Sequence, residues 1–265
     1  MDDIYEEILR LKSKGECAAL ATVISTSGST PREQGAKMLV RQDGSILGTV
    51  GGSILEGQVR EEAIRVIREG KPKVLHFDLT GKSEDGMICG GNVDVYIEPI
   101  IPKATLYLFG GGHISFTLSR LAKLLDYQVV IIDDRKEYAN PARFPEADKT
   151  IADDYPNTFS QVSVDKFSYI VIVTRGHAHD QTVLEWAITT DAQYIGMIGS
   201  RKKIKTIYEH LMTQGVNEDT LKRVHAPIGL DINAETPEEI AVSIIAEIIN
   251  VRRAGMPRKS SGCPA

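Results

Sequence analysis

An alternation of apolar runs and helical stretches, which starts at Ala104, sets the strongest limit on how this chain can fold. Strands are expected at 104–109, 128–132, 168–174, 193–198 and 224–227, and helices at 114–125, 180–190, 201–213 and 236–253. Strands that alternate with helices are typical of a parallel sheet, because each parallel connection must cross over the sheet. This half of the chain therefore predicts a Rossmann-like parallel-sheet domain within an α/β protein.

A glycine-rich turn lies between the first expected strand of this half and its first helix. The turn consists of Gly110, Gly111, Gly112 and His113. Glycine allows a tight turn and a close approach to a pyrophosphate, which binds the free N–H groups at a helix N-terminus. Asp133 ends the next expected strand, where an acidic residue binds a ribose hydroxyl in dinucleotide-binding proteins. The pattern predicts a cofactor site at these residues; alternatively, the glycines serve only close packing of the helix on the sheet.

The loop after the third expected strand carries four polar side chains. Arg175, His177, His179 and Asp180 could clamp an anion or transfer protons. Two histidines and one carboxylate are too few ligands to predict a metal site here. We expect Arg175 to contact a cofactor, and His177 and His179 are candidate catalytic groups. The alternative is that Asp180 only caps the helix that follows.

The turn after the fourth expected strand also leads into a helix. Ser200 and Arg201 begin this helix, and Lys202 and Lys203 follow them. Free N–H groups and cations at the start of a helix favour a phosphate. Ser200 and Arg201 are therefore expected to bind a cofactor, unless the two lysines only form a solvated surface.

The first half of the chain predicts an α+β domain. Its expected elements are a helix at 2–14, strands at 17–25, 37–41, 45–50, 73–79 and 93–100, and a helix at 53–69. Asp43-Gly44 between two apolar runs is typical of a hairpin, and Gly70 with Pro72 ends the second helix. The expected domains are 1–101 and 102–254, followed by a polar, mobile tail at 255–265.

Two small-residue loops of the first half are further candidate sites. Gly28 and Arg32 belong to a loop with a single fixed cation, and Gly51 and Gly52 directly precede the helix at 53–69. Both arrangements suit an anionic cofactor group. Glu56 lies in the first turn of that helix, where it either contacts a cofactor or only complements the helix dipole.

Cys89 stands beside Gly90 and Gly91, in a segment open to a ligand. A thiolate in such a segment can act as a nucleophile or as a soft metal ligand. A buried, inert cysteine is the alternative. Cys89 is therefore a candidate catalytic and metal-ligating residue.

Composition narrows the function classes further. The length of 265 residues favours two domains, and a net charge of −5 with dispersed cations does not favour nucleic acid binding. No apolar stretch approaches the roughly 20 residues of a membrane span, and the acidic start does not resemble a signal peptide. The cysteines are widely spaced and odd in number, at Cys17, Cys89 and Cys263. These features predict a cytoplasmic protein without a membrane partner.

Taken together, the motifs resemble those of the XdhC/CoxI family, accessory factors for molybdenum hydroxylases such as xanthine dehydrogenase. The matching segments run in order over nearly the whole chain: 28–37 (GSTPREQGAK), 48–56 (GTVGGSILE), 87–91 (MICGG), 109–113 (FGGGH), 174–180 (TRGHAHD), 194–203 (YIGMIGSRKK) and 225–245 (HAPIGLDINAETPEEIAVSII). Two positions depart from the family pattern. Ser53 stands where the family often has a third glycine, and Asn233 stands where it usually has glycine.

The resemblance implies a function that composition and spacing do not show. Members bind the molybdenum cofactor (molybdopterin), protect it while a cysteine desulfurase supplies sulfur, and deliver it to a xanthine dehydrogenase-type hydroxylase. It implies an XdhC/CoxI domain followed by a Rossmann domain, and Cys89 would then be a molybdenum ligand or part of a persulfide relay. The chain would be a maturation chaperone rather than an enzyme, and a homodimer is an open alternative.

Two other function classes remain. A nicotinamide-dependent oxidoreductase would bind NAD(P) at Gly110–Gly112 and Asp133 and use His177 or His179 for proton transfer. Saturable binding of NADH or NADPH would distinguish it. A scaffold that bridges a desulfurase and a target enzyme would instead capture both partners without any cofactor.

Overall fold

The computed structural model describes residues 3–80 and 88–254. It divides the chain into two compact units, Met1–Pro102 and Lys103–Ala265. The tail expected at 255–265 lies outside the described residues. None of the helices within the described ranges is long and apolar enough to cross a membrane.

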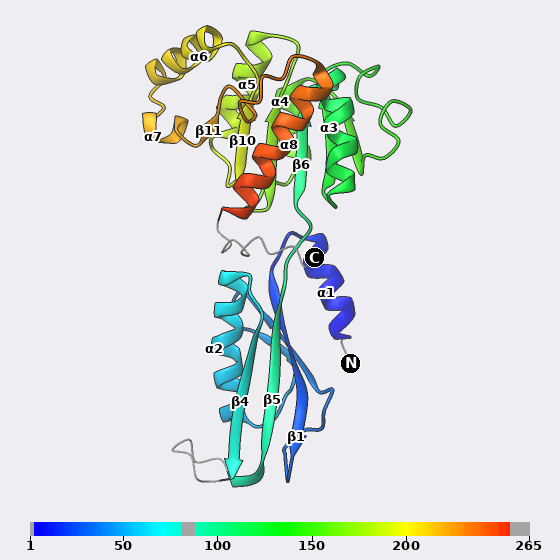
Figure 1. Ribbon diagram of the computed structural model, residues 1–265, viewed down its shortest axis with the longest axis vertical. Helices are drawn as coiled ribbons and strands as arrows, with labels where there is room; N and C mark the ends of the chain where they lie inside the picture. Colours follow the sequence, from blue (N-terminus) through cyan, green and yellow to red (C-terminus); the bar gives the residue numbers. More distant parts are fainter. Residues whose placement is uncertain (1–2, 81–87, 255–265) are drawn as a thin grey trace, which may run out of the picture. The chain divides into compact units, whose positions relative to one another are not determined.

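The described part of the first unit is built on a five-stranded antiparallel sheet (Figure 1). Its strands follow the order β3-β2-β1-β5-β4 and have these bounds: β1 Ala18–Ser27, β2 Lys37–Arg41, β3 Ile46–Gly48, β4 Lys73–Thr80 and β5 Ile88–Ile100. In the β2–β3 hairpin, the Asp43 carboxylate accepts a hydrogen bond from the Ser45 N–H at 2.9 Å, and Gly44 has φ +80°. The turn residues thus form the hairpin for the reason expected from the sequence.

Two helices bury the faces of this sheet. Helix α1 (Ile4–Ser13) packs Ile8 and Leu11 into one cluster with Leu20 and Leu39. Neighbouring residues of a strand face opposite sides, so the buried Ala19 lies on the other face. Helix α2 (Ser53–Glu69) contacts β1 and β5 and ends at Gly70, whose φ is +66°. The expected α+β class of this unit is confirmed.

The described part of the second unit contains a six-stranded parallel sheet. The strands are β6 Thr105–Phe109, β7 Gln128–Asp133, β8 Lys149–Ala152, β9 Ser168–Ile172, β10 Tyr194–Met197 and β11 Val224–His225. Their spatial order is β11-β10-β9-β6-β7-β8, which is third, second, first, fourth, fifth and sixth when read from β8. This is the order of dinucleotide-binding Rossmann sheets. The Rossmann-like prediction is confirmed.

Helices cover both faces of the parallel sheet (Figure 1). They are α3 His113–Leu124, α4 Tyr155–Thr158, α5 His177–Ala187, α6 Arg201–Thr213, α7 Glu218–Leu221 and α8 Pro237–Arg253. Strand β6 shows how the layers form, because Phe109 packs with residues of α5 and α6, whereas Leu108 packs with residues of α3 and α8. A strand buried on both faces explains the near-continuous apolar runs.

Three differences from the sequence expectations affect the site. Strand β9 ends at Ile172, so that Thr174 lies in the loop, and α5 begins at His177 instead of residue 180. Strand β5 begins at Ile88, so that Cys89 belongs to a strand. The short elements β8, α4 and α7 were not expected from the sequence either. Only Ile151 of β8 is buried, which makes its apolar pattern too brief to detect.

Candidate functional site

The carboxyl ends of β6 and β9 form the switch point of the parallel sheet. Strands β7 and β8 are added on one side of β6, whereas β9, β10 and β11 are added on the other. Loops that leave β6 and β9 therefore run in opposite directions, and α/β proteins bind ligands in the crevice between such loops. The structure brings the glycine turn and the 173–176 loop together here, since a Cβ atom at Gly110 would lie 2.3 Å from the Val173 carbonyl oxygen.

The first two glycines of the turn are required for packing. Gly110 has φ +108°, and Gly111 would place a Cβ atom 2.2 Å from the Tyr138 carbonyl oxygen. Both contacts are with main-chain atoms, which cannot move aside as a flexible side chain could. For these two positions, the packing interpretation of the glycine turn therefore holds.

Gly112 differs from both. It is the N-cap of α3, no side chain caps the helix, and a Cβ atom would meet no atom within 4 Å. The first N–H groups of a helix have no partner inside the helix, and no side chain caps those of α3. His113, the first helical residue, is exposed beside them. The start of α3 can therefore accept an anionic group.

Asp133 is committed to bonds within the protein. Its side chain is 1% exposed, and its two oxygens accept hydrogen bonds from the Gly111 N–H at 2.8 Å and the Arg135 N–H at 3.0 Å. Burial opposes ionisation, but the hydrogen bonds from the Arg135 side chain, Gly111 and the Arg135 N–H outweigh it and lower the pKa of Asp133. Asp133 thus holds the glycine turn, and the ribose contact of the nicotinamide interpretation gains no support.

An ion pair that the sequence reasoning missed crosses the end of β6. Asp134 follows β7, Arg175 follows β9, and Nη2 of Arg175 lies 2.6 Å from Oδ2 of Asp134. The Asp134 side chain is 9% exposed, whereas that of Arg175 is 51% exposed. Oδ1 of Asp134 is buried without a hydrogen-bond partner among the described residues. The guanidinium is therefore held at the switch point of the sheet but remains open to an incoming anion.

Helix α5 presents a second open N-terminus at the same edge. Its N-cap is Gly176, which has no side-chain cap, and a Cβ atom at this position would meet no atom within 4 Å. His177 is exposed, and the His179 ring packs edge-on against Tyr155 at 5.2 Å between ring centroids. Nε2 of His179 lies 3.9 Å from the Asp134 carboxylate. Of the two predicted histidines, His179 thus adjoins the Asp134–Arg175 pair.

Asp180 does not cap helix α5, so the interpretation of Asp180 as a helix cap is wrong. Its buried carboxylate accepts hydrogen bonds from the N–H of Thr174 at 3.1 Å and the Thr174 hydroxyl at 2.7 Å. The same carboxylate forms an ion pair with Lys203 of α6. Asp180 therefore fixes the loop before α5 and joins it to the next helix.

The turn at Ser200 is capped by its own chain. Oγ of Ser200 accepts a hydrogen bond from the Lys203 N–H at 3.3 Å. Nζ of Lys203 donates to the Ile198 carbonyl at 3.2 Å as well as to Asp180. Arg201 is exposed. The structure therefore leaves fewer free donors at this turn than at the starts of α3 and α5.

The first unit brings most of its predicted residues together. Gly51 packs against the loop that contains Gly28 and Arg32, since a Cβ atom at Gly51 would lie 3.0 Å from Cγ of Pro31. Gly52 is the uncapped N-cap of α2, with open space in front of it. Among the residues with described side chains, none pairs with the exposed Arg32 guanidinium. Glu56 accepts a hydrogen bond from the Thr49 hydroxyl, which fixes the loop before α2.

Cys89 is the second residue of β5, and its side chain lies outside the described residues. Gly91, two positions later, packs against the main chain of the Gly28 loop, because a Cβ atom there would lie 2.7 Å from the Ser29 carbonyl oxygen. The strand that carries Cys89 thus runs beside that loop. Within the described residues, no group of three His, Cys, Asp or Glu side chains could hold a metal ion.

Each of the two units matches a known protein family. Residues 106–248 match the XdhC Rossmann domain, and residues 11–78 match the XdhC and CoxI family. The chain belongs to the XdhC and CoxI family. The resemblance inferred from the motifs is confirmed.

Three relatives are similar to this chain over most of its length. YqeB, an uncharacterized protein of Escherichia coli, is 33% identical over 94% of this chain and 46% of its own length. A Bacillus subtilis protein described as a probable xanthine dehydrogenase subunit is 32% identical over 67% of this chain and 48% of its own length. The Escherichia coli molybdenum cofactor insertion chaperone PaoD is 22% identical over 95% of this chain and 90% of its own length. The chain spans about half the length of the first two relatives.

A solved structure shares the fold. A crystal structure described as a xanthine dehydrogenase from Bacillus halodurans matches with a TM-score of 0.53 and 23% identity, over 98% of this chain and 97% of that chain. At this level of identity, the likeness shows the fold alone.

The backbone conformation at position 233 suits asparagine as well as glycine. Asn233 has φ +57°, in the left-handed region that favours glycine and that asparagine tolerates best among the other residues. The replacement of the usual glycine by asparagine is therefore compatible with the loop after β11. The other departure, at position 53, falls on the first residue of α2.

Proposed function

We propose that this chain binds the molybdenum cofactor and inserts it into a xanthine dehydrogenase-type molybdenum hydroxylase. Membership of the XdhC and CoxI family supports this proposal, as do a relative named as a molybdenum cofactor insertion chaperone and one named as a probable xanthine dehydrogenase subunit. The cofactor is the cargo of such a protein, held in one step and released in the next.

The observation that carries the proposal is the pair of uncapped helix starts at the switch point of the parallel sheet. Two helices, α3 and α5, begin there behind Gly112 and Gly176, and neither has a side-chain cap. The Arg175 guanidinium lies at the same edge. Free N–H groups and a guanidinium bind phosphate oxygens well, and the pterin cofactor carries a phosphate. We assign the phosphate group of the cofactor to these two helix starts and Arg175.

We propose that residues of the first unit take part in the sulfuration of the cofactor. Cys89 would ligate molybdenum or carry sulfur supplied by a cysteine desulfurase, since a thiolate is both a soft ligand and a nucleophile. Arg32 and the open start of α2 behind Gly52 would attract an anionic group there. Protection of the cofactor during sulfuration is part of the same proposal.

Retention of the cofactor tests the proposal directly. The full chain is mixed anaerobically with molybdenum cofactor and desalted, and the retained molybdenum and pterin are quantified. We expect the wild type to retain both, and Arg175→Gln to weaken retention by about tenfold, because a charge-assisted hydrogen bond is lost. Arg120→Gln serves as the control, since Arg120 is an exposed arginine further along α3.

Activation of an apo-hydroxylase separates binding from delivery. Cys89→Ala should still retain pterin but fail to yield active, sulfurated enzyme when a desulfurase is present. Unchanged activation would remove Cys89 from the mechanism. Lack of retention by the wild type, together with saturable binding of NADH, would replace the proposal with a nicotinamide-dependent oxidoreductase.

A further inference from the structure

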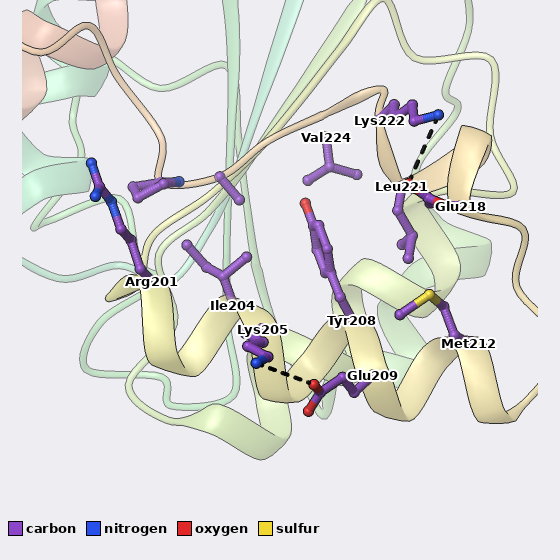
Figure 2. Close-up of a pocket in the computed structure, with 12 residues that line it drawn as sticks. Arg201, Ile204, Lys205, Tyr208, Glu209, Met212, Glu218, Leu221, Lys222 and Val224 are labelled. Carbon is purple, nitrogen blue, oxygen red and sulfur yellow. Dashed lines mark ion pairs between the residues drawn. The ribbon is translucent and has the colours of Figure 1, made fainter.

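A groove of about 600 Å³ lies at the β11 edge of the parallel sheet, between α6 and the segment from Glu218 to Pro227 (Figure 2). Of the residues expected to bind the cofactor, only Arg201 lines it. Sites for small organic molecules commonly have volumes of roughly 300 to 1,000 Å³ and a mainly apolar lining. The groove therefore has the size of a small-molecule site.

The floor of the groove is apolar. Ile204, Leu221 and Val224 are buried there, with exposed fractions of 6%, 3% and 8%. Met212 extends the floor toward the far end of α6 and is 43% exposed (Figure 2). Contact of a ligand with these side chains would remove apolar surface from water, which is favourable in proportion to the area covered.

The charges at the rim of the groove pair with one another, with one exception. Lys205 and Glu209 form an ion pair at 3.8 Å, and Lys222 pairs with Glu218 at 3.9 Å and with Asp219 at 2.9 Å. Arg201, at one end of the groove in Figure 2, has no ion pair or side-chain hydrogen bond with any residue that the structure describes. Arg201 is thus the rim cation without a partner among the described residues, and it also stands at the positive end of the α6 dipole.

Tyr208 adds a polar group inside the groove. Its ring rises from α6 between Ile204 and Met212, and its hydroxyl points toward Val224 (Figure 2). Burial raises the pKa of Tyr208, and no described residue hydrogen-bonds its hydroxyl. The hydroxyl is therefore an available donor or acceptor in a largely apolar surrounding.

We propose that this groove binds a small organic anion with an apolar or aromatic body and one acidic group. The body lies on Ile204, Tyr208, Met212 and Leu221, and the acidic group binds the Arg201 guanidinium. Charge complementarity selects a singly charged anion, because Arg201 is the rim cation that lacks a partner within the described residues. The proposal does not depend on the cofactor function.

Anilinonaphthalene sulfonate is a suitable probe, because it combines an aromatic body with one sulfonate. Fluorescence titration of the full chain should show saturable binding at one site. Arg201→Gln should raise the dissociation constant about tenfold, and Tyr208→Phe about threefold. Phenylnaphthylamine has the same aromatic body without the sulfonate, and its binding should not respond to Arg201→Gln.

Lys202→Gln is the matched control, since it removes a neighbouring cation of α6 that lines a different pocket, with His177 and Ser200. The Lys202→Gln variant should bind anilinonaphthalene sulfonate with the same dissociation constant as the wild type. Methyl-labelled methionine locates the probe: the Met212 resonance should shift, and that of the buried Met38 should not. An equal loss in Lys202→Gln and Arg201→Gln, or an unmoved Met212 resonance, would overturn the proposal.

Discussion

The starts of α3 and α6 look alike in sequence but differ in what they offer a ligand. Both helices follow a parallel strand and a glycine, and both turns are candidates for a phosphate site. At α3, the N-cap is Gly112 and no side chain returns to the helix. At α6, the Ser200 hydroxyl accepts the Lys203 N–H, and the Lys203 amine is directed to Asp180. The same strand-to-helix turn can thus be open or closed.

A helix N-terminus becomes an anion site only where the chain leaves its donors free. An N-cap side chain satisfies donors that an anion would otherwise bind. Glycine at the N-cap of α3, and again at α5 and α2, gives up this stabilisation. A helix start without a capping side chain is less stable, and it can indicate an anion-binding site. Anion binding and capping compete for the same N–H groups.

The largest effect is expected at Asp180, which joins the loop before the open start of α5 to Lys203 at the capped start of α6. Asp180→Ala should lower the free energy of unfolding by about 3–5 kcal/mol, because it leaves the Lys203 charge without its buried partner. Urea unfolding measures this loss. The double variant Asp180→Ala/Lys203→Met should recover part of the stability; an equal loss in both variants would show that the ion pair is not the cause.

The next largest effect on the free energy of unfolding distinguishes Gly111 from Gly112 in the turn before α3. Gly111→Ala should cost about 3 kcal/mol, because its Cβ atom would lie 2.2 Å from the Tyr138 carbonyl oxygen. Gly112→Ala should cost about 0.5 kcal/mol, because its Cβ atom would meet open space. Urea unfolding of the two variants compares them directly. Similar losses at both positions would contradict the division into packing and open glycines.

A smaller, pH-dependent effect is expected at the carboxylate that holds the α3 turn. Asp133→Asn should lower the free energy of unfolding by about 1–3 kcal/mol at pH 7, through the loss of charge-assisted bonds. The pKa of Asp133 is lowered from its ordinary 3.8, so its contribution is present above about pH 4 and is lost as the pH falls through the folded-state value.

Unfolding midpoints of the wild type and Asp133→Asn should therefore converge below about pH 4. A difference that stays constant down to the acid-unfolding region would show that folding does not lower the pKa of Asp133.

The smallest effects are expected from changing the N-cap residues, Gly112 of α3 and Ser200 of α6. Gly112→Asp should raise the stability by a few tenths of a kcal/mol, and Ser200→Gly should lower it by a similar amount. The backbone permits the first change, because Gly112 has φ −72° and ψ −167°. Thermal unfolding of both variants measures the shifts. Destabilisation by Gly112→Asp would mean that the start of α3 is not open.

Much of this fold follows from the sequence alone. Runs such as 106–109 and 169–172 are apolar at every position, so burial on both faces of a parallel sheet is evident. Strand β8 escapes detection, because Lys149 and Thr150 are not buried and only Ile151 is. Edge strands of this kind carry too little apolar pattern to distinguish them from loops.

The site is less predictable than the fold. The glycine turn is visible as a motif, but the roles of its residues depend on distant main-chain atoms such as the Tyr138 carbonyl. Asp134 adjoins the expected Asp133, and two acidic residues at the end of a buried strand could have indicated it. The groove at Arg201 was not detectable, because its two walls are separate in sequence and are paired only by the fold.

Cofactor affinity of the cap-exchange variants is the decisive measurement for the open turn at α3. The dissociation constant for molybdenum cofactor is measured anaerobically for the wild type, Gly112→Asp and Ser200→Gly, with pterin and molybdenum quantified together. We expect Gly112→Asp to weaken binding by about tenfold or more, since a carboxylate then occupies the N–H groups, whereas Ser200→Gly should leave binding unchanged. Unchanged binding in Gly112→Asp, or weaker binding in Ser200→Gly alone, would contradict the assignment of the cofactor phosphate to the open start of α3.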